Sequence, residues 1–131
     1  MSEYPTIVSF YTDTWDYKKH AIRLARECDV YKLPHHIVEL PDTGRWIDNT
    51  RLKPKFIYDA IREIKRPILW LDVDASILNP PDALKLPISY DFMGVHQRIG
   101  PMRQWHVGTM FFNYNDAVID FLGKWVELKI G

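Results

Sequence analysis

The sequence is poor in the features that mark secreted, membrane-spanning and nucleic-acid-binding proteins. Its one cysteine, Cys28, cannot form an internal disulfide, so we expect a small buried side chain in a reducing, cytoplasmic setting. Seventeen basic residues balance seventeen acidic ones, which leaves no basic excess for general DNA or RNA binding. No uncharged apolar run reaches membrane length, and the residues after Met1 resemble no secretion signal. These absences predict an unsecreted protein without a membrane span.

Internal repeats, low-complexity tracts and Gly/Ser linkers are missing as well, which predicts a single domain over residues 1–131. The sequence is rich in hydrophobic and aromatic residues. Hydrophobic residues make up 47% of it and aromatic residues 14%, enough to bury one sizeable core.

Hydrophobic patterning predicts alternating strands and helices. The β-branched segments 6–11 (TIVSFY) and 35–40 (HHIVEL) are typical of strands. Apolar residues recur at helical spacing after each of them, over 15–28 and from about residue 50 to 64. The continuous apolar run 68–71 (ILWL) indicates a central parallel strand that is covered on both faces.

Three further elements complete the prediction. Strands are expected over 90–96 and 107–113, with a polar loop between them. A last helix capped by Asn115 follows, and its expected buried stripe is Val118, Phe121, Leu122 and Trp125. This order predicts an α/β fold, a three-layer sandwich around a mainly parallel sheet. Ligands usually bind at the edge where the carboxyl ends of parallel strands meet.

The triplet Asp72-Val73-Asp74 follows the central strand directly. Residues two apart in an extended segment face the same side, so both carboxylates can approach one hard divalent cation, Mn²⁺ or Mg²⁺. Such a cation could bridge the phosphate oxygens of a ligand. In the plainer alternative, one aspartate caps the next turn and the other is solvated. The position at the carboxyl end of a strand favours the metal site.

Residues 51–81 (RLKPKFIYDAIREIKRPILWLDVDASILNPP) resemble the central part of the GT-A-type nucleotide-diphospho-sugar transferases, glycosyltransferases with a DxD motif. The segments 8–13 (VSFYTD) and 106–113 (HVGTMFFN) are similar to two other parts of that family. The resemblance implies a minimal or truncated GT-A, Rossmann-like fold and a nucleoside-diphosphate sugar as donor, most simply a UDP-sugar. It also implies a divalent metal and transfer of the sugar to an acceptor that the sequence does not identify.

The resemblance also implies roles for individual residues. Asp72 and Asp74 would hold the metal and so serve catalysis. Arg51, Lys53 and Lys55 could offer cationic contacts to phosphate or base, or be ordinary solvated helix residues. The residues expected to bind the nucleotide sugar are Tyr11, Thr12, Asp13, Arg51, Lys55, Asp72 and Val73, and those expected on the acceptor side are Trp105, His106, Gly108 and Asn113.

Members of this family are usually longer, and their C-terminal part often supplies another metal ligand. His96 or His106 could replace that ligand, and Asp91 or Asp116 could be the base of an inverting enzyme. We therefore keep several forms open: a minimal enzyme, a donor-binding half completed by a partner chain or a homo-oligomer, an inactive relative, or a fragment.

Two other functions stay open. One is a catalytically silent protein that sequesters a nucleotide or a nucleotide sugar. The other is a haloacid-dehalogenase-type (HAD) phosphatase, because 71–76 (LDVDAS) resembles the motif in which the first aspartate is a nucleophile. That family, however, places its motif on the first strand and needs a later lysine and acidic pair, for which the remaining sequence offers no convincing set.

Overall fold

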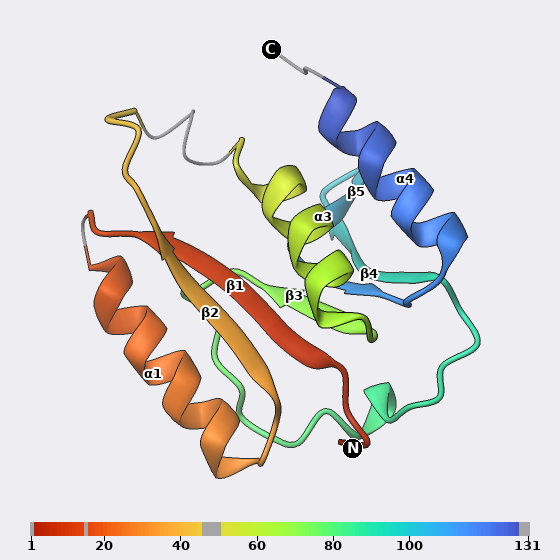
Figure 1. The fold of residues 1–131 in the computed structure, drawn as a ribbon, viewed down its shortest axis with the longest axis horizontal. Coiled ribbons are helices and arrows are strands. Elements are labelled where there is room, and N and C mark those ends of the chain that lie inside the picture. Colours follow the sequence, from red (N-terminus) through yellow and green to blue (C-terminus); the bar gives the residue numbers. More distant parts are fainter. Residues whose placement is uncertain (1, 15, 46–50, 129–131) are drawn as a thin grey trace.

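The structure is a computed structural model that describes residues 2–14, 16–45 and 51–128, with the backbone alone for 96–99 and 102–106. The start of the second helix, predicted near residue 50, falls outside these ranges. The elements run in the order β1 (Thr6–Thr12), α1 (Tyr17–Val30), β2 (His35–Leu40), α3 (Lys53–Ile64), β3 (Ile68–Leu71), the 3-10 turn η1 (Asp82–Leu84), β4 (Phe92–Ile99), β5 (Met102–Phe112) and α4 (Asp116–Glu127) (Figure 1).

The sheet has five strands in the order β2-β1-β3-β5-β4. Strand β1 pairs in parallel with both β2 and β3, whereas β5 is antiparallel to both β3 and β4. The predicted α/β class is confirmed, but the sheet is mixed rather than mainly parallel. The two-residue connection of Gly100 and Pro101 requires β4 and β5 to be antiparallel, and β5 also runs antiparallel to β3.

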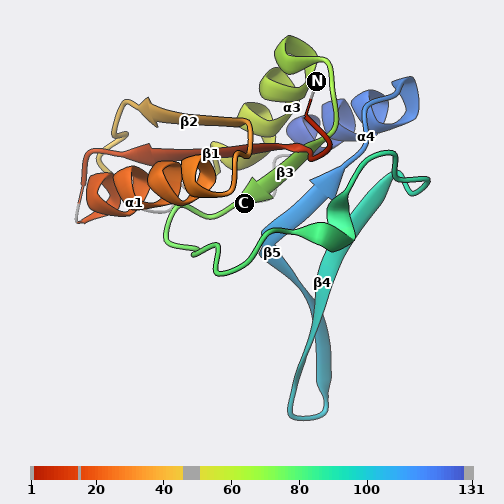
Figure 2. The same cartoon turned by 90° about the horizontal axis from the view of Figure 1, so that it is seen from below.

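Helices cover both faces of this sheet, so the three predicted layers are present. Figure 2 shows α1 on one side and α3 with α4 on the other. The buried residues under α3 and α4 are Val8, Ile57, Ala60, Ile61, Ile68, Trp70, Met110, Phe112, Val118 and Leu122. Those under α1 and the segment that follows β3 are Ile7, Leu24, Cys28, Leu33, Leu69, Leu71 and Phe111. Strand β3 is buried along its whole length because it lies between these two cores.

Local sequence accounts for most helix boundaries and buried faces. Asn115 caps α4 as predicted, since its Oδ1 accepts a hydrogen bond from the backbone N–H of Val118 at 2.9 Å. Cys28 is fully buried against the sheet, and this burial raises the pKa of its thiol to about 12. The prediction that Phe121 is buried is wrong. Its side chain is 56% exposed, because α4 turns the neighbouring Leu122 onto the core instead.

The hairpin of β4 and β5 is longer than the sequence pattern predicts. The polar loop expected between the two strands is wrong, because β4 continues to Ile99 and β5 begins at Met102. Figure 2 shows the outer part of this hairpin projecting away from the rest of the sheet. The pairing changes register where it leaves the sheet: Gly94 pairs with Met110, but Val95 pairs with His106. Residues 107–109 therefore have no counterpart on β4 and form a β-bulge.

In the described part of the chain, no helix combines the length and apolar character that a bilayer crossing requires.

Candidate functional site

A cleft of about 280 Å³ lies at the edge of the sheet where β1 and β3 end. Parallel strands β1 and β3 bring their carboxyl ends together there, and the first turns of α1 and α3 flank them. Tyr11, Thr12, Asp72, Val73 and Asp74, all predicted site residues, meet in this cleft. Among the described residues, the lining consists of Phe10, Tyr11, Thr12, Thr14, Tyr17, Lys53, Trp70, Asp72, Val73 and Asp74.

Asp72 is held from three sides. Its backbone N–H donates to the carbonyl of Gly108 at 2.9 Å, which ties the end of β3 to β5. Its Oδ1 accepts hydrogen bonds from Lys53 Nζ and from the indole Nε1 of Trp70, both at 3.0 Å. Within the described residues no donor reaches Oδ2, and the side chain is 42% exposed. The carboxylate is therefore oriented by one oxygen and open to a ligand through the other.

Lys53 is the cation of this cleft. Its Nζ donates to Asp72 Oδ1, lies 3.3 Å from the carbonyl of Val107, and sits over the Trp70 ring at 5.1 Å from the centroid. Only 17% of its side chain is exposed. Sequence reasoning named Lys53 but did not select it. A signal was present, because Lys53 lies four residues before the buried Ile57 and so faces the sheet.

The two cations that were selected, Arg51 and Lys55, do not line the cleft. Lys55 is exposed and forms an ion pair with Asp59 on its own helix at 2.8 Å. Their contact with a nucleotide sugar stays a prediction. The spacing explains the difference, since residues 53 and 55 point about 200° apart around a helix with 3.6 residues per turn.

Asp74 lines the cleft because the chain turns after Asp72, which the sequence did not predict. The backbone N–H of Ala75 donates to the carbonyl of Asp72 at 2.9 Å, so the triplet forms a turn. The expectation that an extended segment aligns the two carboxylates is wrong. Both aspartates nevertheless line one cleft, and Val73 between them is buried. Asp74 is exposed and makes no hydrogen bond or ion pair with any described residue.

Residues at the end of β1 form the opposite wall. The buried Thr12 shares a hydrogen bond with Thr14, with 2.8 Å between their hydroxyl oxygens. Phe10 packs against Trp70, with ring centroids 5.5 Å apart, and this contact fixes the apolar floor under Lys53. Tyr11 and Tyr17 add aromatic surface to the lining. Asp13 is exposed and lies outside the lining, so its part in binding stays a prediction.

The residues predicted on the acceptor side do not gather in one place. Gly108 lies beside Asp72, as its carbonyl contact shows. Asn113 lies at the other end of β5, where its Nδ2 donates to the carbonyls of Ile88 and Tyr90. These bonds join the end of β5 to the segment before β4, and a part for Asn113 in acceptor binding stays a prediction. Only the backbone of Trp105 and His106 is described, and the same holds for His96, so the acceptor and ligand roles of these side chains stay predictions.

The oxygen ligands that the cleft offers suit a hard divalent cation. Asp72 Oδ2 and both carboxylate oxygens of Asp74 have no donor among the described residues, and carboxylate oxygen is the ligand type that Mg²⁺ and Mn²⁺ prefer. Searched over the described residues, the structure holds no group of three or more histidine, cysteine or acidic side chains suited to a metal. Asp91 and Asp116, the two candidate bases of an inverting enzyme, do not line this cleft, and that role stays a prediction.

We compared this chain with known protein families, curated proteins and solved structures. No family model matches the chain, and no curated protein matches it. Among solved structures, the chain is similar to a glycosyltransferase involved in the glycosylation of the major capsid of PBCV-1, with a TM-score of 0.72 and 15% sequence identity. This chain shares the fold of that glycosyltransferase.

The similarity covers 97% of this chain and 66% of the matched chain. At this identity it establishes the glycosyltransferase fold and leaves activity, donor and acceptor to be tested. The GT-A-type fold that the resemblance of residues 51–81 implied is confirmed.

Proposed function

We propose that this protein is a metal-dependent glycosyltransferase that takes a sugar from a nucleoside-diphosphate sugar, in the first instance a UDP-sugar. The observation that carries the proposal is the meeting of Asp72, Asp74 and Lys53 at the carboxyl end of β3. Two carboxylates beside one enclosed ammonium group suit a diphosphate that arrives with a divalent cation. The glycosyltransferase fold supports the same assignment.

Each side chain has a distinct part in this proposal. Asp72 and Asp74 would hold Mn²⁺ or Mg²⁺ through their open oxygens. A cation bound there would supply Lewis-acid stabilisation of the negative charge that grows on a departing nucleoside diphosphate. Lys53 is anchored to Asp72 and to the carbonyl of Val107, and from that position its Nζ would donate to a phosphate oxygen.

The wall formed by the end of β1 would bind the nucleoside. Tyr11 and Tyr17 offer ring surface on which a base can stack. The hydroxyl of Thr12, already paired with that of Thr14, is a donor and acceptor within reach of the cleft and would bind the ribose. The donor would thus lie across the edge of the sheet, as ligands usually do in open α/β sheets.

Titration calorimetry with UDP and with GDP, each with and without Mn²⁺, tests the proposal. We expect UDP to bind at least about tenfold more tightly when Mn²⁺ is present, because the carboxylates otherwise repel the diphosphate. Binding that is absent, or that does not depend on the metal, would reject the proposal.

A second measurement separates a transferase from a sequestering protein. Incubation with UDP-sugars followed by mass spectrometry should show slow hydrolysis or transfer of the sugar. A donor that binds but stays unchanged would identify the catalytically silent alternative. Hydrolysis of a generic phosphomonoester that is lost in Asp72→Asn would instead support the HAD-type reading, in which Asp72 is a nucleophile.

A further inference from the structure

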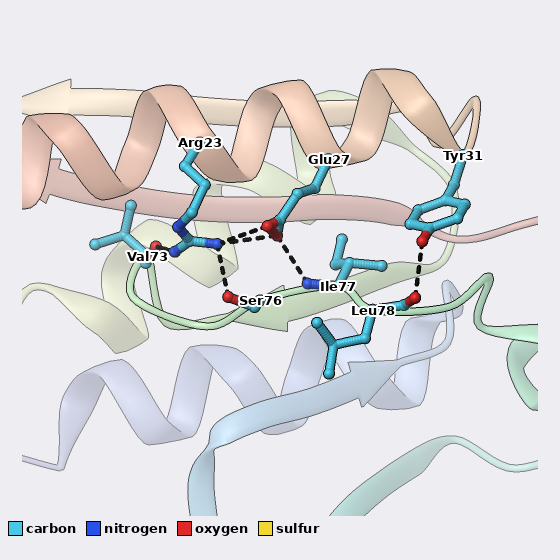
Figure 3. Close-up of polar contacts among 7 residues, drawn as sticks. All are labelled: Arg23, Glu27, Tyr31, Val73, Ser76, Ile77 and Leu78. Carbon is cyan, nitrogen blue, oxygen red and sulfur yellow. Dashed lines mark hydrogen bonds and ion pairs between the residues drawn. The ribbon is translucent and has the colours of Figure 1, made fainter.

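One stripe of α1 holds the segment that follows the acidic triplet. Arg23 and Glu27 lie one turn apart on the same face of α1, and Tyr31, the capping residue that ends the helix, continues their spacing of four. Figure 3 shows all three side chains pointing from α1 to the backbone between Val73 and Leu78. We call these three residues the α1 clamp. Sequence reasoning did not find it, because about fifty positions separate the helix from the segment that it holds.

Arg23 makes the contacts nearest to the triplet. Its Nη2 donates to the carbonyl of Val73 at 3.3 Å, and its Nη1 donates to Ser76 Oγ at 2.9 Å. The same Nη1 contacts both carboxylate oxygens of Glu27, at 2.9 and 3.0 Å. One guanidinium group therefore spans the turn from Val73 to Ser76 while the neighbouring carboxylate holds it in place (Figure 3).

Glu27 and Tyr31 make hydrogen bonds to the backbone further along the same segment. Glu27 Oε1 accepts a hydrogen bond from the backbone N–H of Ile77 at 2.8 Å. The hydroxyl of Tyr31 donates to the carbonyl of Leu78 at 2.8 Å. The side chains of Arg23 and Glu27 are only 33% and 22% exposed, so solvent competes less for these bonds than it does at an open surface.

The clamp matters to the cleft because no hydrogen bond or ion pair from a described residue holds the Asp74 side chain. Its two neighbours in the chain are fixed: Val73 by Arg23, and Ala75 by its hydrogen bond to the carbonyl of Asp72. The place of the Asp74 carboxylate therefore depends on the backbone that Arg23 holds. A segment that is already ordered loses less conformational entropy when a ligand binds, and so binds more tightly.

We propose that Arg23 and Glu27 are positioning residues that hold Asp74 at the cleft and thereby set the metal affinity of the Asp72-Val73-Asp74 turn. Neither residue lines the cleft, so they act through the backbone and not by touching metal or donor. This inference rests on the proposed function, since it assumes that Asp74 binds a cation.

Replacement of the arginine tests the inference directly. We expect Arg23→Met to raise the Kd for Mn²⁺ by about tenfold, because the turn must then be ordered on binding. Arg23→Lys should fall between Met and wild type, since an ammonium group can pair with Glu27 but cannot span Val73 and Ser76 as a planar fork does. Arg62→Met is the matched control, because Arg62 lies on α3 over the ring of Tyr58 and outside the cleft lining.

A double substitution separates positioning from a general loss of structure. If Arg23 acts through Asp74, then Arg23→Met combined with Asp74→Asn should bind Mn²⁺ no more weakly than Asp74→Asn alone. Strictly additive losses would overturn the inference. Should Arg23→Met fail to fold, Glu27→Gln replaces it as the test, because the amide keeps an acceptor for Ile77 while weakening the hold on Arg23.

Hydrogen exchange of the Ile77 amide reports on the clamp without any ligand. We expect this amide to exchange at least about tenfold faster in Arg23→Met, while amides in α3 and α4 keep their rates. Unchanged exchange would overturn the clamp whatever the protein binds. A wild-type protein that binds no Mn²⁺ would overturn the proposed function and this role together, whereas wild-type affinity in Arg23→Met would overturn only the role of Arg23.

Discussion

Lys53 Nζ lies 3.0 Å from Asp72 Oδ1, although the two residues belong to different elements. The lysine side chain is 17% exposed and the carboxylate 42%, so the protein's own cation is the more enclosed member of the pair. The pair balances the charge of Asp72 in the absence of a ligand. It also leaves the second carboxylate oxygen facing the cleft, where an incoming cation and diphosphate would have to share Asp72 with Lys53.

Lys53→Met should therefore change metal and nucleotide binding in opposite directions. Mn²⁺ alone is expected to bind roughly threefold to tenfold more tightly, since a competing cation beside Asp72 is gone. UDP in saturating Mn²⁺ should bind about tenfold more weakly, because a charged donor to phosphate is lost. Titration calorimetry measures both. Lys124→Met, which breaks an exposed ion pair with Asp120 on α4, should change neither, and equal effects in the two variants would contradict the prediction.

Asp74→Asn should remove metal affinity without affecting the fold. The side chain is exposed and bonds to no described residue, so the free energy of unfolding should change by less than about 0.5 kcal/mol. The affinity for Mn²⁺ should fall at least about tenfold, because an amide oxygen is a weaker ligand for a hard cation than a carboxylate. Urea unfolding and metal titration on one preparation check both statements. Full affinity in the variant would mean that Asp74 is no ligand.

Cys28 should make stability fall as the pH rises above about 9. Burial, and then the carboxylates of Asp29 and Glu27, raise the pKa of this thiol from 9.0 to about 12. Between these values the unfolded chain has released the thiol proton and the folded chain retains it, so alkaline pH favours unfolding. Urea unfolding at pH 8 and pH 10 measures the decline. In Cys28→Ala this part of the pH dependence should disappear, and an unchanged dependence would locate it elsewhere.

Replacement by alanine should lower the free energy of unfolding very differently at two neighbouring positions on α4. Leu122 is fully buried, so Leu122→Ala should cost about 2 to 5 kcal/mol of unfolding free energy. Phe121 is 56% exposed, and Phe121→Ala should change that free energy by no more than about 0.5 kcal/mol. Urea unfolding compares the two proteins. Similar losses would show that the ring of Phe121 is covered in solution.

The sequence predicted the parts of the site that depend on strand ends. Asp72 could be placed because the apolar run of β3 ends immediately before it, and Tyr11 and Thr12 could be placed because β1 ends there. Residue type alone does not distinguish Lys53 from Lys55. The phase of the helix does, since Ile57 is buried and lies one turn further on.

Other parts of the site could not be read from a single sequence. The clamp joins Arg23 to Val73 and Ser76, and no local pattern links residues so far apart in the chain. The turn pair Gly100-Pro101 is the sequence signal for the antiparallel direction of β4 and β5. The exposure of Phe121 had none, since both Phe121 and Leu122 lie at helical spacing from Val118 and only the sheet decides between them.

The β-bulge at residues 107–109 divides the long hairpin into two parts with different constraints. Its inner part belongs to the sheet, and the bulge itself offers the carbonyls of Gly108 and Val107 to Asp72 and Lys53. Its outer part, from Val95 and His106 to the turn, pairs only with itself. Residues can therefore be added in pairs at Gly100-Pro101, one to each strand, without shifting any residue that faces the core. The length and sequence of this arm can therefore change while the strands that line the cleft keep their register.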